Sequence, residues 1–394
     1  MEGYALDWAE LVIRWVHLIT GIAWIGASFY FVFLDNSLLP PKRKDDADAG
    51  VGGELWAVHG GGFYHVQKYR VAPATLPEPL HWFKWEAYWT WMSGLALFVV
   101  MYYVHADRYM IDKSVADIAP WQAIAISLAL LVAGWVFYDQ LCKRAGLERE
   151  RLVAVVMIVF LSLVAFGVSH VFSGRATFLQ VGAMMGTIMA WNVYFVIMPS
   201  QRELVAAKVR GAAPDPVWGL RGKQRSVHNN YFTLPVLFIM ISNHYPLTYG
   251  YKHPWLVLIA AGLIAAFVRH FFNLRHKGRT VWAIPVVAAV ATLVLAVTIA
   301  PERPKAAAFT FAQVQKIVTE RCAGCHAAKP TFAGFSEAPK GVLLDTPDQI
   351  VAHAQAISQQ AVQTKAMPIG NLTQMTDEER MVLGGWIAAG APPK

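Results

Sequence analysis

Two of the three cysteines in this chain lie close together near its C-terminal end, in a stretch that could do redox chemistry. The stretch "TERCAGCH" holds Cys322 and Cys325, separated by two residues, with His326 directly after the second. Structural zinc takes four ligands, and no second cysteine pair follows. A redox dithiol would lie in a βαβ context, which the sequence does not indicate. A c-type haem needs two thiols and an adjacent histidine, so the motif favours one covalent haem c with His326 as an axial ligand to its iron.

The sixth iron ligand is expected downstream of the motif. Met367 precedes a proline in the loop-like stretch "KAMPIGN", which suits it, and Met375 and Met381 are the alternatives. The Pro- and Ala-rich stretch at 301–308 predicts a linker, and 309–394 has the composition of a small soluble domain. A short helix runs into the motif, and Thr376 and Glu379 have the spacing of a helical capping box. These features predict a class I-type cytochrome c domain.

The segment before this domain has the composition of a membrane protein. The chain is 56% hydrophobic and 15% charged, whereas soluble domains are about a quarter charged. Three cysteines exclude a disulfide framework. A spanning helix needs roughly 20 apolar residues, and eight segments qualify: 9–34, 85–104, 119–140, 152–172, 177–199, 230–247, 254–274 and 280–300. The sequence therefore predicts an all-α fold, with a polytopic eight-helix transmembrane bundle at 1–300 and a long loop at 35–84.

The basic residues gather in alternate loops. The first, third, fifth and seventh loops hold 19 Lys and Arg, against 4 in the others. The positive-inside rule makes those four loops cytoplasmic and both termini periplasmic, in a bacterial inner membrane. The net charge of +8 therefore indicates membrane orientation and not nucleic-acid binding. This orientation places 309–394 outside the cytoplasm, where haem c is attached.

Polar residues inside the spans are candidate sites, because they are costly in a bilayer. Histidines on different spans at matched depth suit the axial ligation of one or two haem b groups, whereas the alternative is hydrogen bonding between helices. The outer pair is His17 and His170. The inner candidates are His228 and His270, with His244 as a further one. The inner layer also offers substrate-binding candidates, which are Asn192, Asn229, Asn230 and Arg269.

The first cytoplasmic loop carries a triple glycine at 60–62 between segments of alternating character. This pattern predicts a turn between two short strands, with His65 on one face and Lys68 on the other as further substrate-binding candidates. The alternative is a plain aromatic and basic hairpin at the membrane surface. A phosphate loop is excluded because no Lys-Ser/Thr follows the glycines.

Several long stretches match a known family. The combination of "HGGGFYHVQKYRVAPATLPEPLHWFKWEAYWTWMSG", "MAWNVYFVIMPSQRELV", "RSVHNNYFTLPVLFIMISNHYP" and the C-terminal "CAGCH" resembles the bacterial membrane-bound, cytochrome c-fused urate oxidases. The resemblance covers essentially the whole chain. The membrane stretches are specific, whereas Cys-x-x-Cys-His alone occurs in many cytochromes.

This resemblance implies the oxidation of urate with water to 5-hydroxyisourate in purine catabolism. The electrons would pass through haem to haem c and on to a periplasmic cytochrome c or a terminal oxidase of the respiratory chain. The catalytic residues are not fixed by the resemblance. The rival interpretation is a non-catalytic electron conduit or a quinol–cytochrome c oxidoreductase in the bilayer.

Overall fold

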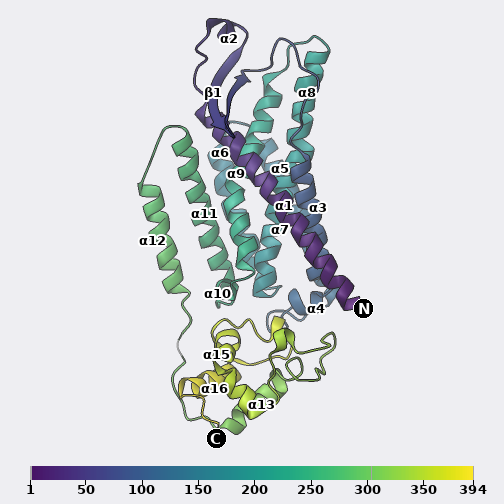
Figure 1. Cartoon of the computed structure of the whole chain (residues 1–394), viewed down its shortest axis with the longest axis vertical. Helices are drawn as coiled ribbons and strands as arrows, with labels where there is room; N and C mark the ends of the chain where they lie inside the picture. The colour runs from purple at the N-terminus through teal and green to yellow at the C-terminus, as the bar shows by residue number, and fades with distance from the viewer. Residues whose placement is uncertain (1, 303, 394) are drawn as a thin grey trace.

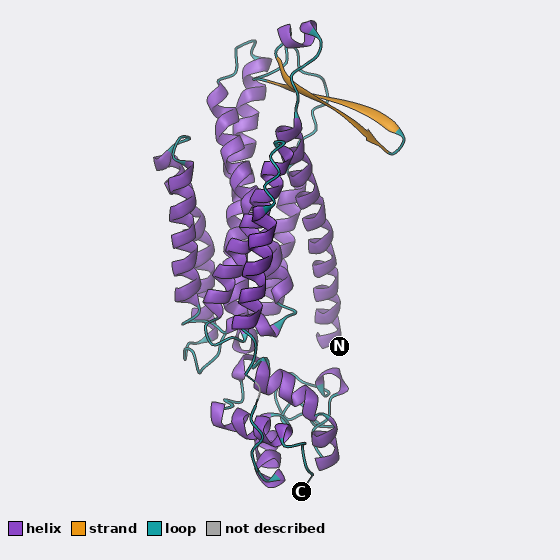
Figure 2. Cartoon of the chain, turned by 90° about the vertical axis from the view of Figure 1, so that its left-hand side faces the viewer, coloured by secondary structure: helices purple, strands orange, loops and turns teal. Residues whose placement is uncertain are grey.

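The computed structural model describes residues 2–302 and 304–393, and most of them are helical. Long helices run side by side along the molecule, a two-stranded hairpin lies at one end, and a small helical unit lies at the other (Figures 1 and 2). The start of α1 lies at the same end of the bundle as the C-terminal unit (Figure 1). The two ends of the chain therefore share one side of the bundle.

Each of the eight predicted spans lies mainly in a helix. Within residues 2–302 and 304–393, five helices are long and apolar enough to cross a membrane: Tyr4–Ser37, Pro120–Ala145, Glu150–Val168, Gly174–Val209 and Pro254–His276. The apolar helix Ala283–Thr298 is shorter. The bounds of the long elements are α1 Glu2–Ser37, α3 Trp85–Phe98 with a π-helical turn Val99–Tyr103, α5 Pro120–Ala145, α6 Glu150–Val168, α7 Gly174–Asn192 with a π-helical turn Val193–Ile197, α8 Met198–Val209, α9 Pro216–Ser242, α11 Pro254–His276 and α12 Ala283–Thr298.

The sixth predicted span is corrected by the structure. The sequence placed it at 230–247, whereas α9 begins at Pro216, behind an N-cap bond that the Asp215 side chain accepts from the Val217 amide. The hydropathy pattern missed the first turns because they carry Arg221, Lys223 and Arg225. The short helices between the long ones are α2 Lys44–Asp48, α4 Ala106–Tyr109 and α10 Pro246–Tyr249.

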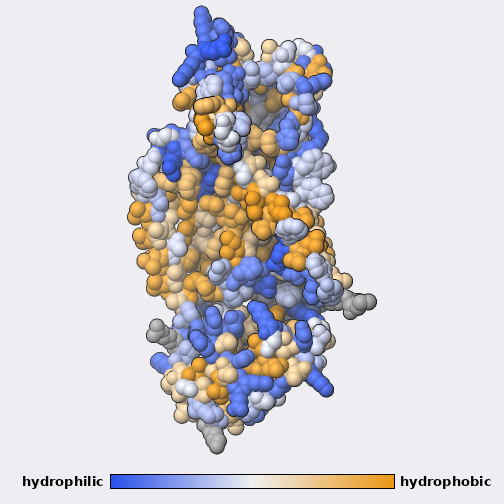
Figure 3. All heavy atoms as spheres, viewed as in Figure 1, coloured by the Kyte–Doolittle hydropathy of each residue, from blue (hydrophilic) through white to orange (hydrophobic). Residues whose placement is uncertain are grey.

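Helix α7 forms the centre of the bundle. It packs against α3, α5, α6, α9 and α11, and nearly all of its residues from Ala176 to Asn192 are buried. A helix that is buried on every side needs no polar face. The outer helix α12 instead exposes Val286, Val290 and Leu293. Apolar side chains make a band across the middle of the surface, and hydrophilic ones cover both ends (Figure 3).

The predicted turn between two short strands is confirmed. Strand β1 (Val51–His59) pairs antiparallel with β2 (Gly62–Tyr69), and His59 faces Gly62. The two residues between them, Gly60 and Gly61, have φ of 56° and 81°. A two-residue hairpin turn needs this left-handed backbone, which explains the glycines.

The C-terminal unit is a small helical domain with its own core. Its main helices are α13 Phe311–Arg321, α14 Pro347–Ala352, α15 Ala354–Ile357 and α16 Asp377–Ala388. Val314, Val318, Leu383 and Trp386 are fully buried between α13 and α16. The predicted capping box at Thr376 is present, so α16 begins where the sequence indicated.

Candidate functional site

The Cys-x-x-Cys-His motif begins where α13 ends. A capping box at Thr310 starts the helix, and Cys322 is the C-cap residue at its end. Both motif cysteines are free thiols. His326 Nδ1 lies 3.0 Å from the Val342 carbonyl oxygen, which can only accept, so Nδ1 carries the proton. The other ring nitrogen, Nε2, is then the basic one, as in a metal-ligating histidine whose orientation is fixed by a backbone carbonyl.

The two thiols are held in their neutral form. Burial raises the pKa of Cys322 to about 12. Burial also raises the pKa of Cys325, although Arg108 opposes this. A redox dithiol needs a depressed cysteine pKa, so the surroundings of this pair do not favour a redox dithiol.

The three methionine candidates differ in their surroundings. Met381 is 63% exposed on α16, whereas Met375 is buried in the domain core. Met367 is half-buried against the same core, and its carbonyl oxygen accepts a 2.8 Å hydrogen bond from the Arg380 guanidinium. Arg380 also donates to the Ala361 carbonyl oxygen. The loop that carries Met367 is therefore fixed by a buried cation.

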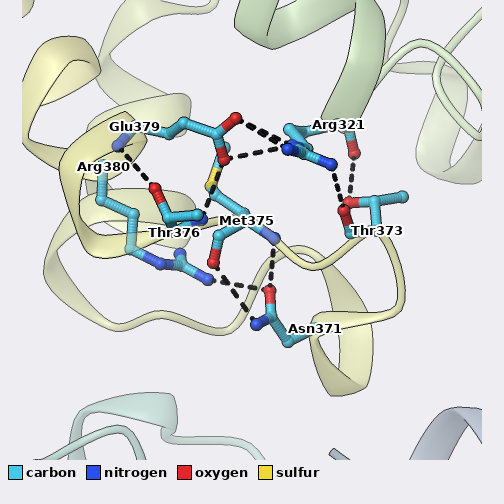
Figure 4. A network of polar contacts seen from close by, with 7 residues as sticks. All are labelled: Arg321, Asn371, Thr373, Met375, Thr376, Glu379 and Arg380. Atoms are coloured by element: carbon cyan, nitrogen blue, oxygen red, sulfur yellow. Dashed lines mark hydrogen bonds and ion pairs between the residues drawn. The ribbon is translucent and has the colours of Figure 1, made fainter. Parts of the chain in front are cut away.

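A polar network joins α13 to the segment before α16 (Figure 4). Arg321 makes two hydrogen bonds to the Glu379 carboxylate, at 2.9 and 3.1 Å from its Nε, and donates to the Thr373 carbonyl oxygen at 2.7 Å. Asn371 accepts from the Met375 amide at 3.0 Å. These bonds hold the Cys-x-x-Cys-His end of α13 against α16 and against the segment 371–375, which carries Met375.

The donor set fits a haem c. Cys322 and Cys325 offer two thiols, His326 offers Nε2, and Met367 lies on a fixed loop. Among the residues at 2–302 and 304–393, no group of three or more His, Cys, Asp or Glu side chains is arranged to hold a bare metal ion.

The C-terminal domain contacts the bundle through the loop around α4. Arg108 donates a 2.7 Å hydrogen bond to the Ala333 carbonyl oxygen, and its guanidinium lies over the Phe335 ring, 5.4 Å from the centroid. A Cβ at Gly370 would lie 2.5 Å from the Arg108 carbonyl oxygen. The backbone three residues after Met367 therefore touches the bundle directly.

A second polar network lies inside the bundle, between α5, α7 and α9. The Asn192 amide donates to the Tyr138 hydroxyl at 3.1 Å and to Asn229 Oδ1 at 3.0 Å. The Tyr138 hydroxyl lies 2.7 Å from His228 Nδ1, and His228 Nε2 lies 2.7 Å from the Glu150 carboxylate. With the Nε2 proton directed at Glu150, His228 Nδ1 accepts the tyrosine proton. The result is a continuous chain from a buried amide to a partly exposed acid.

A buried ion pair lies next to this chain. Arg225 and Asp139 are 2.9 Å apart, and their side chains are only 4% and 3% exposed. The Arg225 guanidinium also lies over the Tyr138 ring, 4.8 Å from its centroid. Breaking a buried pair leaves an uncompensated charge, so this pair fixes how α5 and α9 meet.

A third network links α9 to α11. Arg269 Nε donates to Asn230 Oδ1 at 2.5 Å, and the Asn230 amide donates to Asn273 at 3.0 Å. The Tyr231 hydroxyl lies 2.7 Å from His270 Nδ1. Arg269 and His270 are neighbours in the sequence, so they point to different sides of α11.

A cavity of about 920 Å³ runs between α6, α9 and α11. Its walls are mostly apolar, and both His228 and His270 line it. The Tyr231 hydroxyl engages His270 Nδ1. His270 Nε2 is then the nitrogen that could bind the iron of a haem b. His228 fits less well, because both of its nitrogens are engaged. A haem b here would have to replace the contact between His228 and Glu150.

The outer histidines are not brought together. His17 Nδ1 donates to the Thr90 carbonyl oxygen at 3.0 Å, so this side chain faces α3. His170 follows α6 and donates to the Phe166 carbonyl oxygen at 2.8 Å, in an exposed turn. Helix α1 packs mainly on α3, whereas α6 packs on α5, α7 and α11. His244 is exposed in the turn after α9.

The hairpin candidates are bound by local partners. His65 Nε2 donates to Glu54 at 2.9 Å, and its ring stacks on Trp56 with centroids 4.2 Å apart. Lys68 pairs with Asp35 at the end of α1. His65 therefore holds the hairpin in shape, whereas Lys68 ties it to Asp35 of α1, which also lies 4.0 Å from Lys223 of α9.

Sequence reasoning missed several polar partners. Tyr138 and Glu150 complete the chain at His228, and Asp139 neutralises Arg225. A signal existed for Asp139, which is an acid within a predicted span. No sequence signal marked Tyr138, because a tyrosine near the end of a span is ordinary.

Comparison with known families places the chain. The family model described as "Urate oxidase N-terminal" matches residues 3–300. No curated protein and no solved structure matches. The match covers most of the chain, and the chain therefore belongs to the urate oxidase N-terminal family, with the whole helical bundle inside the matched region.

Proposed function

We propose that this protein is a membrane-bound oxidoreductase that converts urate and water to 5-hydroxyisourate. The reaction releases two electrons and two protons for each urate. The observation that carries the proposal is the family match over residues 3–300, which spans all the long helices. Five apolar helices of sufficient length support a multi-pass position in a bilayer.

The C-terminal domain is proposed as the electron outlet. A haem c bound through Cys322 and Cys325 would supply a one-electron acceptor outside the bundle. His326 is the proposed axial ligand on one side, oriented by Val342, and Met367 is the ligand on the other. A periplasmic cytochrome c or a terminal oxidase would then take the electrons, with both termini of the chain in the periplasm.

The bundle is proposed to bind urate and to move its protons. The chain from Asn192 through Tyr138 and His228 to Glu150 ends on a carboxylate whose side chain is 46% exposed. Such a chain can carry a proton from a buried site to water. The cavity beside it, between α6, α9 and α11, is the proposed place for a haem b, with His270 as the better-placed ligand. The pairing of His17 with His170 is not part of this proposal, because the structure does not bring the two side chains together.

The second candidate function is an electron conduit without urate chemistry. The observation in its favour is the mostly apolar cavity of about 920 Å³, which would also accept a quinol. The two functions differ in which molecule donates electrons to the haem, urate or a quinol.

Anaerobic reduction of the purified full-length protein separates them. Urate should produce the absorption bands of a reduced cytochrome and should be consumed. Reduction by a quinol and not by urate would favour the conduit. The double variant Cys322→Ala/Cys325→Ala should lose haem staining on a denaturing gel, whereas Cys142→Ala, at the third cysteine, should keep it. Full staining in the double variant would overturn the haem assignment.

A further inference from the structure

A second and smaller cavity lies between α1 and α11, at the hairpin end of the bundle. Its volume is about 340 Å³, which is within the range of small-molecule pockets. Three phenylalanines, one arginine and one histidine give it an unusual lining for a membrane surface. Its walls are formed by Phe29, Phe33, Leu234, Arg269, Phe272 and His276.

Two polar atoms in this lining lack a partner. Arg269 Nη2 and His276 Nδ1 are buried, and neither has a hydrogen-bond partner among the residues that the structure describes. The Arg269 residue is only 3% exposed. An unpaired buried group costs free energy, so a native structure needs a reason for it, and a ligand is one such reason. Two such atoms converge here on one cavity.

The charge around the cavity favours an anion. On the α11 wall, residues 254–301 contain no Asp or Glu, and on the α1 wall Asp35 is already paired with Lys68 and Lys223. Arg275 and Lys277 at the end of α11 have an ordinary role, since cations stabilise a helix C-terminus. Arg269 lies almost two turns further inside the helix, so that role does not explain it.

The rings favour a planar ligand. The Arg269 guanidinium lies 3.8 Å from the centroid of the Phe29 ring, and Phe33 meets His276 edge-on with centroids 5.5 Å apart. Phe29 holds the guanidinium flat, and because Asn230 engages Arg269 Nε, Nη2 is the donor that remains for the oxygen of a planar anion, while the Phe33 ring supplies an aromatic surface. A flexible phospholipid would use the charge but not these faces.

We propose that this cavity binds the urate anion, with Arg269 and His276 donating to the oxygens and nitrogens of the purine and the phenylalanines enclosing its rings. The inference rests on the proposed function and locates its substrate at the end of the bundle remote from the C-terminal domain. It also assigns Phe29, Phe33 and His276 to the site, none of which the sequence had marked.

Binding can be tested without turnover. The full-length protein is reduced with dithionite under nitrogen, so that urate has no oxidant, and radiolabelled urate is added in equilibrium dialysis. Arg269→Gln should weaken binding about 30-fold, the effect of losing a charge-assisted hydrogen bond. Phe33→Leu should weaken it about 5-fold. Because Phe33 is 36% exposed, this second variant keeps the fold intact.

Matched controls are available on the same helices. Arg275→Gln removes an exposed cation from α11, and Phe31→Leu removes a ring from α1 that packs against Phe83 outside the cavity. Both should bind urate within about 2-fold of the wild type.

Each outcome has one meaning. Wild-type protein that binds no urate would overturn the proposed function itself. Wild-type binding that survives both Arg269→Gln and Phe33→Leu would leave the function standing and overturn this site. Unchanged urate binding together with loss of co-purifying anionic phospholipid in Arg269→Gln would show a lipid site and would also overturn it.

Discussion

The ion pair between Arg321 and Glu379 should hold the Cys-x-x-Cys-His end of α13 against α16, and Glu379→Gln tests this. Glutamine keeps the capping box, because its side-chain oxygen can still accept from the Thr376 amide as the carboxylate does at 2.8 Å (Figure 4). The substitution therefore removes only the charge of the pair. The α16 helix should stay capped but lose its bond to α13.

The stabilisation that the pair contributes depends on how exposed its two side chains are. Arg321 and Glu379 side chains are 26% and 18% exposed. Hydrogen bonds to charged groups contribute about 1.5–3 kcal/mol, and partial exposure places this pair near the lower end, at about 1.5 kcal/mol. Amides of α16 should then exchange with deuterium about tenfold faster in Glu379→Gln at pH 7.

The sign of the pH dependence is fixed by the carboxylate. Burial raises the pKa of Glu379, but the hydrogen bonds from Arg321 and the Thr376 amide more than offset this, and the pKa lies below its ordinary value. A depressed carboxylate pKa stabilises the fold above the unfolded pKa of about 4.3, and this is lost as the pH falls through the folded pKa. The loss of stability that Glu379→Gln causes, relative to the wild type, should therefore shrink towards zero in acid.

Hydrogen exchange of the full chain, followed by mass spectrometry from pH 7 to pH 3 and corrected for intrinsic rates, measures both effects. Glu378→Gln is the matched control, since it removes an exposed carboxylate from the same turn. Asp377, whose pKa is lowered by its hydrogen bond to Lys365, titrates in both variants and cancels. Equal exchange in the two variants at pH 7, or a deficit that persists at pH 3, would refute the reasoning.

Three further predictions concern the proposed haem, the docking and the topology. Met367→Ala should leave the haem attached but lower its reduction potential in a redox titration, and an unchanged potential would move the ligand to Met375 or Met381. Arg108→Ala should free the loop at 331–335, so that its amides exchange about tenfold faster, whereas unchanged exchange would mean that Arg108 does not hold the domain. Reporter fusions after Lys208 and after Pro304 should report the cytoplasm and the periplasm, and the reverse result would contradict the distribution of basic loops.

Local chemistry made much of the fold predictable from the sequence. Hydropathy located the core of each long helix, the glycines at 60 and 61 marked the hairpin turn, and Thr376 marked the start of α16. Each of these signals lies within a few residues of the feature it predicts. The start of α9 at Pro216 was missed because hydropathy does not detect a helix that leaves the apolar layer.

The contacts between helices could not be predicted from the sequence. Matched depth suggested that His17 and His170 share a site, but depth does not say which way a side chain points around its helix or which helices are neighbours. The same limit hid the pair of Asp139 with Arg225, which are 86 positions apart. The cavity at Arg269 needs Phe29 and Phe33 from the other end of the chain, and no local pattern connects them.

The two proposed ends of the reaction lie far apart, and this separation argues for a redox relay. From Pro254 to Arg269 the helix α11 rises about 22 Å, at 1.5 Å per residue, and the C-terminal domain lies beyond its first residue (Figure 1). That distance is too long for one efficient electron transfer.

The cavity between α6, α9 and α11 runs along this path, and His270 faces it directly after Arg269. A haem b on His270 would lie at the depth of Arg269, and the cavity extends from there along α11 to Leu258, which is nearer the C-terminal domain. A pyridine haemochrome assay decides this: one extractable b-type haem per chain, lost in His270→Ala and retained in His244→Ala, supports the relay. A preparation that oxidises urate with only haem c would refute it and would place urate close to the C-terminal domain, against the Arg269 site.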